Sequence, residues 1–221
     1  MFPFAKTLSS VTKANLLGLI FACAGVAVAV VLVMVGSLTW LTAHLVNIRI
    51  GWLDSLVNWF AGGILGVAGW FMLPAIIVLV AGMFQEKTIH RVEQAFYPEE
   101  VRSREPRFWP DFAYDIRFTL RALLLNVLVL PLYLIGIGFV VSVALNSYLV
   151  GREFFESAAG YHLGKPQAKI VGQQNKAAVY GGGLVITLMT LTPVINLFVP
   201  VFAIVWMVHV YHGLKKETPA D

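Results

Sequence analysis

The chain has 221 residues, of which 58% are hydrophobic and only 13% charged, and its mean hydropathy is +0.78. This composition excludes an ordinary soluble globular domain and indicates an all-α integral membrane protein. The formal net charge of +4 comes from basic residues that lie between apolar segments. That placement favours contact with anionic lipid headgroups over a nucleic-acid partner.

Four stretches contain no Asp, Glu, Lys or Arg, and each exceeds the roughly 20 residues that cross a bilayer as a helix. They cover residues 14–43, 55–85, 122–151 and 177–214. We therefore predict one membrane domain over residues 1–221. Its single cysteine, Cys23, lies in the first stretch, so no disulfide can form within one chain, and we interpret it as a packing residue.

The first two stretches are expected to span the membrane once each. Residues 14–43 contain no proline and predict one continuous helix, with Ser9, Ser10 and Thr12 before it as candidate N-cap residues. Residues 55–85 predict a second spanning helix that is kinked at Pro74. The Gly62 and Gly66 spacing in this helix suits close helix packing, with a merely small stretch as the alternative.

Residues 86–121 follow as an amphipathic segment that mixes arginines with aromatic residues. We expect this segment to be cytoplasmic and interfacial, with aromatic rings at headgroup depth and guanidinium groups toward lipid phosphates. A role of the arginines in collecting substrate is the alternative. The residues concerned are Arg102, Arg104, Arg107 and Trp109.

The third and fourth stretches are each interrupted near the middle. Pro131, Gly136 and Gly138 divide residues 122–151, and a segment from Thr192 to Pro200 divides residues 177–214. The apolar halves, of about 10–14 residues, are shorter than a full span and suit re-entrant segments. The expected fold is therefore two long spanning helices plus two re-entrant, partly penetrating helical hairpins, with residues 152–176 as a cytoplasmic segment between the hairpins.

The distribution of Lys and Arg supports this topology. If the first two stretches cross once and the last two return, every Lys and Arg except Arg49 lies on one side of the membrane. Single crossings by the last two stretches would instead place residues 152–176 opposite the other basic loops, against the positive-inside bias. A multi-pass protein with both termini in the cytoplasm is expected.

The hairpin turns are candidate anion sites. A half-helix that begins inside the membrane directs unpaired N–H groups and its positive dipole end into the interior, where they can hold an anion. Simple tight turns are the alternative. Arg152 and Glu156 after the first hairpin have i,i+4 spacing, which indicates a helix-end ion pair, with a gate or ligand site as the alternative. The candidate residues here are Gly136, Gly138, Asn146, Arg152 and Asn196.

The sequence contains no recognised enzyme motif, and we expect no catalytic residue, metal site or cofactor. The five histidines are scattered along the chain and are interpreted as interfacial residues. Because the apolar stretches contain no Asp or Glu and no Lys or Arg, the chain lacks the buried relay typical of proton-coupled carriers. Any transport is expected to be passive or channel-like.

Three blocks in this order resemble the CysZ family, the bacterial sulfate permeases related to etoposide-induced membrane proteins: residues 130–138, residues 147–154 and above all residues 192–201. The resemblance implies sulfate uptake across the bacterial inner membrane for cysteine synthesis, by a homo-oligomer. Relatives carry a Gly-Leu-Arg or Gly-Ile-Arg-Arg stretch for sulfate at the start of the first helix. Here the corresponding candidates are Thr12, Lys13 and Asn15. Because Lys13 lacks the fork of Arg, a non-transporting membrane scaffold or lipid-interacting protein is the alternative.

Overall fold

The computed structural model describes residues 3–45, 51, 55, 59–60, 62–63, 84–101, 108–196 and 198–217. Every regular element in these ranges is helical, as the sequence predicts. Contacts divide the chain into two compact units, one over residues 18–84 and one over residues 1–17 with 85–221. Each unit is described by itself.

The unit over residues 18–84 contains most of α2, Leu17–Leu45. This helix lies where the first span is predicted, and its residues Leu17–Leu41 are long and apolar enough to cross a membrane. Its 29 residues extend about 43 Å at 1.5 Å per residue. The predicted kink at Pro74 and the predicted packing at Gly66 lie outside the described residues. Among the described residues, a Cβ at Gly62 would meet Thr39 at an ordinary 4.0 Å.

The second unit begins with a helix that the sequence analysis did not anticipate, α1, Phe4–Lys13. The N-cap prediction for Ser9, Ser10 and Thr12 is therefore wrong, because all three lie inside α1 rather than before α2. The chain turns between the two helices at Asn15, whose φ of +49° lies in the left-handed region. Asn tolerates that region better than most residues, which explains why the break falls there.

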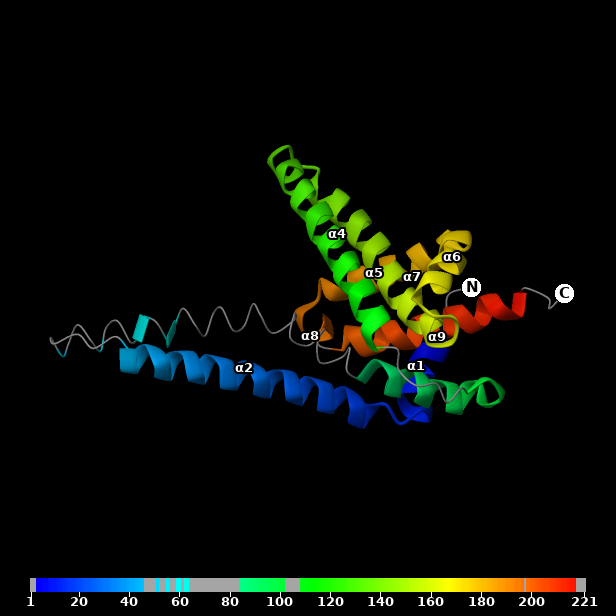
Figure 1. Cartoon of the computed structure of the whole chain (residues 1–221), viewed down its shortest axis with the longest axis horizontal. Coiled ribbons are helices and arrows are strands. Elements are labelled where there is room, and N and C mark those ends of the chain that lie inside the picture. Colours follow the sequence, from blue (N-terminus) through cyan, green and yellow to red (C-terminus); the bar gives the residue numbers. More distant parts are fainter. Residues whose placement is uncertain are drawn as a thin grey trace. The chain divides into compact units, whose positions relative to one another are not determined.

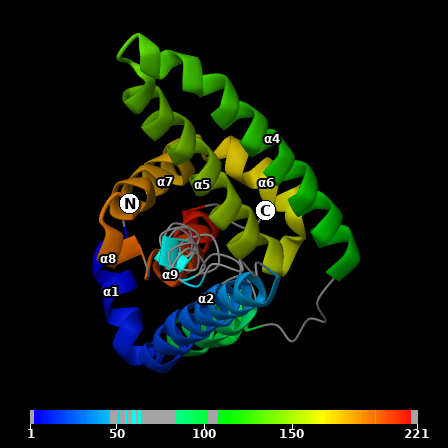
Figure 2. The ribbon, with the colours of Figure 1, turned by 90° about the vertical axis from the view of Figure 1, so that its left-hand side faces the viewer.

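The first predicted hairpin is formed by α4, Phe108–Leu134, and α5, Gly138–Leu163. The two helices lie side by side in both ribbon views (Figures 1 and 2). The turn falls at Gly136, whose φ of +82° ends the helix in a conformation that suits glycine.

Two details of the sequence prediction for this hairpin are wrong. Pro131 does not interrupt the chain, because α4 runs through it to Leu134 and loses only the backbone donor that Pro lacks. The helices also have 27 and 26 residues instead of 10–14. Both helices continue into polar and aromatic residues beyond the uncharged stretch of residues 122–151, so each helix is longer than its apolar part.

The remaining helices carry the fourth stretch. After α6, Lys165–Gln174, the chain forms α7, Lys176–Thr190, the short α8, Pro193–Asn196, and α9, Val199–Glu217. The predicted interruption between Thr192 and Pro200 is confirmed, since α7 ends before it at Thr190 and α9 begins only at Val199. Pro200 lies in the first turn of α9, where its missing N–H costs no helical hydrogen bond.

The core of this unit forms where α5, α7 and α9 pack together (Figure 2). Trp206 and Met207 of α9 are almost completely buried there. Gly151 of α5 and Gly183 of α7 bring the two helix backbones into direct contact, because a Cβ at Gly183 would overlap the Ser147 carbonyl oxygen. Small residues at a crossing allow this closeness, as in many membrane helix pairs.

The hairpin of α4 and α5 is apolar on its outside. Residues Ile116–Leu134 of α4 are the second described segment long and apolar enough to cross a membrane. Leu134 at its end is 90% exposed. Contiguous exposed apolar surface of this kind marks a membrane or protein contact. Other exposed apolar residues on the hairpin include Leu120, Leu123, Leu128, Leu130, Phe139 and Val140.

A candidate anion site and a buried histidine cluster

Arg152 of α5 lies at a junction of several helices. Its Nε donates to Oε1 of Glu156 at 2.6 Å, one helical turn later. The side chains of Arg152 and Glu156 are 17% and 4% exposed, so the pair is largely shielded from solvent. Among the described arginines, Arg152 is the one that is not exposed. The predicted i,i+4 ion pair is confirmed.

Two aromatic residues of α4 hold this pair. Tyr114 donates its hydroxyl proton to Oε2 of Glu156 at 2.7 Å and accepts from Nη2 of Arg152 at 3.2 Å. The Arg152 guanidinium also lies over the Phe118 ring, 5.1 Å from its centroid, at cation–π distance. The guanidinium is therefore oriented by a carboxylate, a phenol and an aromatic face from two helices.

A small cavity of about 10 Å³ adjoins the pair. This volume holds about one water molecule, so an oxyanion does not fit without a local rearrangement. Arg152 and Lys169 oppose the single carboxylate of Glu156 on its walls, which gives the cavity a positive balance. The full lining is Tyr148, Arg152, Phe155, Glu156, Lys169, Gly172, Gln173, Val179 and Tyr180.

The predicted anion positions at the hairpin turns are not gathered around Arg152. Gly136 lies in the turn before α5 and Gly138 begins α5, about 20 Å from Arg152 at 1.5 Å per residue. Asn146 donates to the Ser142 carbonyl at 2.9 Å, so its amide bonds along its own helix. Asn196 ends the four-residue α8. Their predicted role in anion binding stays a prediction.

The candidates at the start of the first predicted span lie directly before α2. Thr12 and Lys13 end α1, and Asn15 lies in the turn between α1 and α2. Their predicted role in anion binding stays a prediction. A guanidinium that the sequence analysis did not select reaches this turn, since Nη1 of Arg91 donates to the Asn15 carbonyl at 2.9 Å. Lys13 lies over the Phe96 ring at 5.6 Å.

The interfacial candidates are described only in part. Arg102, Arg104 and Arg107 lie outside the described residues. Trp109 lies in the first turn of α4. The lipid-facing role of these four residues stays a prediction.

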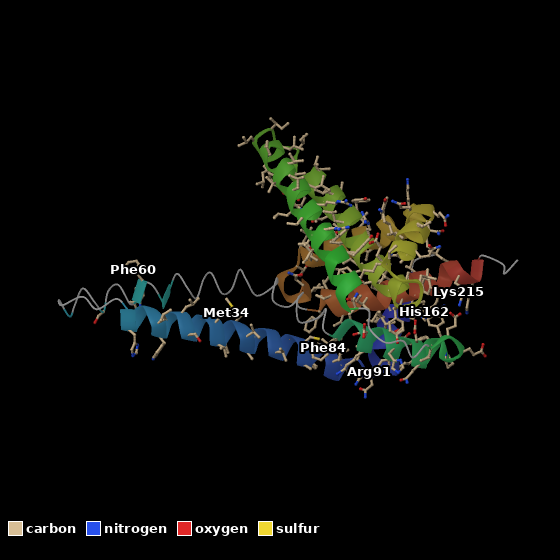
Figure 3. All side chains as sticks on the ribbon, viewed as in Figure 1. Met34, Phe60, Phe84, Arg91, His162 and Lys215 are labelled. Atoms are coloured by element: carbon tan, nitrogen blue, oxygen red, sulfur yellow. The ribbon has the colours of Figure 1, made fainter. Side chains whose placement is uncertain are left out.

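A cluster that the sequence analysis missed joins three helices in this unit. Glu93, in a helix over residues 84–96, is fully buried, and its Oε1 lies 2.6 Å from Nε2 of His162 and 3.0 Å from Nε2 of His212. His162, which is labelled in Figure 3, belongs to α5, and His212 belongs to α9. These residues are 69 and 119 positions from Glu93, so no local spacing could reveal the cluster.

Electrostatics keep the Glu93 carboxylate charged. Burial by itself raises the pKa of the Glu93 carboxyl, but the hydrogen bonds from His162 and His212 and their positive potential outweigh it and hold the pKa below the ordinary value. The three ligand atoms of Glu93, His162 and His212 lie within 4.8 Å of one another, which makes them the residues here that could hold a metal ion.

His209 extends the buried polar network toward α1. Its Nε2 lies 2.8 Å from the Ser10 hydroxyl, and its Nδ1 lies 2.9 Å from the Tyr97 hydroxyl. Phe4 of α1 also packs against Trp206 of α9, with ring centroids 6.2 Å apart. These contacts place α1 on α9 and show that His209 is a buried residue with partners on both ring nitrogens.

Comparison with known proteins identifies a family for nearly the whole chain. A family model described as sulfate transporter CysZ/etoposide-induced protein 2.4 matches residues 3–200. Searches of curated proteins and of solved structures gave no match.

Proposed function

Because the chain belongs to the sulfate transporter CysZ/etoposide-induced protein 2.4 family, we propose that it moves sulfate or a related oxyanion passively across the bacterial inner membrane. The family match over residues 3–200 carries this proposal. The family is described by transport and not by an enzymatic reaction. Supply of sulfur for cysteine synthesis and assembly into a homo-oligomer belong to the same proposal.

The helical architecture supports a membrane location. Two described segments, Leu17–Leu41 and Ile116–Leu134, are long and apolar enough to cross a bilayer. The outward-facing leucines of α4 suit lipid contact, because they would otherwise expose apolar surface to water. We propose that α4 with α5, and α7 with α9, enter the membrane as hairpins from the cytoplasmic side, where the termini and residues 152–176 remain.

Within this architecture, Arg152 is the residue that we assign to anion contact. A planar guanidinium can bind two oxygens of a tetrahedral oxyanion at once, whereas a lysine ammonium acts as a point charge. In the present conformation Glu156 accepts from Nε of this guanidinium and Tyr114 accepts from Nη2. An arriving anion competes with Glu156 for Arg152, so the ion pair acts as a gate that opens only when the carboxylate moves away.

Sulfate flux tests the proposal directly. Radiolabelled sulfate uptake into proteoliposomes should exceed uptake into empty liposomes. Arg152→Lys keeps the charge but cannot bind two oxygens of the anion at once, and we expect flux to fall about 10- to 100-fold, since one lost charged hydrogen bond is worth roughly 1.5–3 kcal/mol. Arg117→Lys, at an exposed position on α4, is the matched control and should transport normally.

Two results would count against the proposal at different levels. Folded wild-type protein that gives no flux above empty liposomes would refute transport. Wild-type flux in Arg152→Lys would leave transport intact but refute the role of Arg152.

A membrane scaffold or lipid-interacting role is the second candidate. The cavity beside Arg152 admits about one water molecule in this conformation, and the hairpin presents a broad apolar surface. A scaffold should be stabilised by lipid and not by sulfate. Thermal unfolding in a series of sulfate, selenate, phosphate and chloride separates the two roles, because a sulfate-selective rise in Tm would rule against the scaffold.

A further inference from the structure

The cluster of Glu93, His162 and His212 carries an inference that does not depend on transport. We propose that these three side chains bind a divalent transition-metal ion of the zinc type, which ties the helix over residues 84–96 to α5 and α9. Two imidazoles and one carboxylate form a common zinc donor set.

The distances suit such an ion after small side-chain movements. Zinc binds imidazole nitrogen and carboxylate oxygen at about 2.0–2.2 Å, so ligand atoms around a tetrahedral ion lie about 3.3 Å apart. Oε1 of Glu93 lies 2.6 Å from His162 Nε2 and 3.0 Å from His212 Nε2. All three ligand atoms lie within 4.8 Å. Movements of less than 1 Å would make room for the ion.

A second observation points to a ligand. Both imidazoles crowd onto Oε1 of Glu93, while Oε2 of the same buried carboxylate makes no hydrogen bond among the residues that the structure describes. A carboxylate held only by hydrogen bonds would be expected to share its two oxygens between two donors. A bound cation accounts for this unpaired oxygen, because Oε2 can bind the ion as a second ligand atom or turn toward it.

The surroundings of His212 match those of a metal ligand. Its Nδ1 lies 3.3 Å from Oε2 of Glu100, while its Nε2 faces Glu93. Metal-binding histidines commonly direct their second nitrogen to a carboxylate, and Nδ1 of His212 lies near that of Glu100, although it makes no hydrogen bond among the described residues. Glu100 in turn accepts from the Lys215 ammonium at 2.7 Å.

Aromatic stacking fixes both imidazole planes. The Tyr97 ring stacks on His212 with centroids 4.0 Å apart and planes 19° apart. The Tyr211 ring stacks on His162 at 5.5 Å and 15°. Rings held in this way lose little freedom on binding an ion, so the site is organised in advance.

The charge at the site also suits a cation. The buried Glu93 carboxylate supplies one negative charge beside the two imidazoles. Glu100, whose Oε2 pairs with the Lys215 ammonium, brings a second carboxylate close to His212.

The first test uses full-length protein without a polyhistidine tag, purified in detergent, stripped with chelator and dialysed. Zinc titration followed by elemental analysis should give one tightly held ion per chain. His162→Gln and His212→Gln should each lower zinc affinity at least tenfold. His90→Gln, on the same helix as Glu93 and bonded to Gln94, is the matched control and should bind as wild type does.

A second measurement avoids variants that disturb the core. The double variant His44→Gln/His90→Gln retains only the buried histidines, and cobalt loading should give the visible absorption of a four-coordinate ion with nitrogen and oxygen ligands. The zinc-loaded form should show imidazole scattering in its X-ray absorption spectrum. Less than one-tenth of an ion per chain, unchanged binding in both His→Gln variants, or a cobalt spectrum without a four-coordinate signature would overturn the proposal.

Discussion

The close crossing of α5 and α7 gives the sharpest structural prediction. A Cβ added at Gly183 would overlap the Ser147 carbonyl oxygen and lie 2.7 Å from the Gly151 Cα. Carbon atoms in contact normally lie 3.5–4.0 Å apart. Because the obstructing atoms belong to the backbone, Gly183→Ala requires the two helices to move apart by about 1 Å.

The free energy of unfolding should fall accordingly. Overpacking typically costs 1–3 kcal/mol, and the backbone clash places Gly183→Ala at or above the upper end of that range. Replacing a helical glycine by alanine returns about 1 kcal/mol. The net loss is about 2 kcal/mol, and for a chain of this size it lowers Tm by about 4–8 °C.

Thermal unfolding in detergent measures this effect against a matched glycine. Among the residues that the structure describes, a Cβ at Gly213 of α9 meets nothing within 4 Å. Gly213→Ala should therefore gain helix propensity without a clash and raise Tm by about 2–4 °C. If Gly183→Ala unfolds at or above the wild-type temperature, the close crossing of α5 and α7 is not present in the protein.

The remaining predictions address charge and topology. A double-mutant cycle of Arg152→Ala and Glu156→Ala should show a coupling of at least 1 kcal/mol in chemical denaturation, because either single change leaves a shielded charge unpaired; additive losses would contradict the pair. In chelator-treated protein, the lowered pKa of the Glu93 carboxyl adds to the free energy of unfolding. This contribution is complete above the ordinary carboxyl pKa and is lost as the pH falls through the lowered pKa. Glu93→Gln should therefore flatten the plot of Tm against pH between about pH 5 and pH 3, and an unchanged slope would contradict the contribution of Glu93. In a Cys23-free chain, an impermeant thiol reagent applied to intact cells should spare single cysteines introduced at Ser103, Ser157 and Thr218. Labelling of Ser157→Cys alone would show that the α4–α5 hairpin crosses the membrane.

Local sequence information determined the helical fold class and several boundaries of this protein. Apolar length predicted α2, and the positions of Gly136 and of the segment from Thr192 to Pro200 predicted where two helical stretches turn. The i,i+4 spacing predicted the pair of Arg152 and Glu156, because neighbours one helical turn apart meet whatever the tertiary structure. These features depend on residues that follow one another closely in the sequence.

The tertiary structure decided what meets across helices. Tyr114 reaches Arg152 from α4, and Glu93, His162 and His212 converge from three helices although 69 and 119 residues separate them. Local patterns cannot encode such contacts, because helix rotation and crossing angle choose which faces meet. In this protein, helix rotation and crossing angle depend on the side-chain volumes packed between α5, α7 and α9. The absence of a side chain at Gly151 and Gly183 is part of that packing.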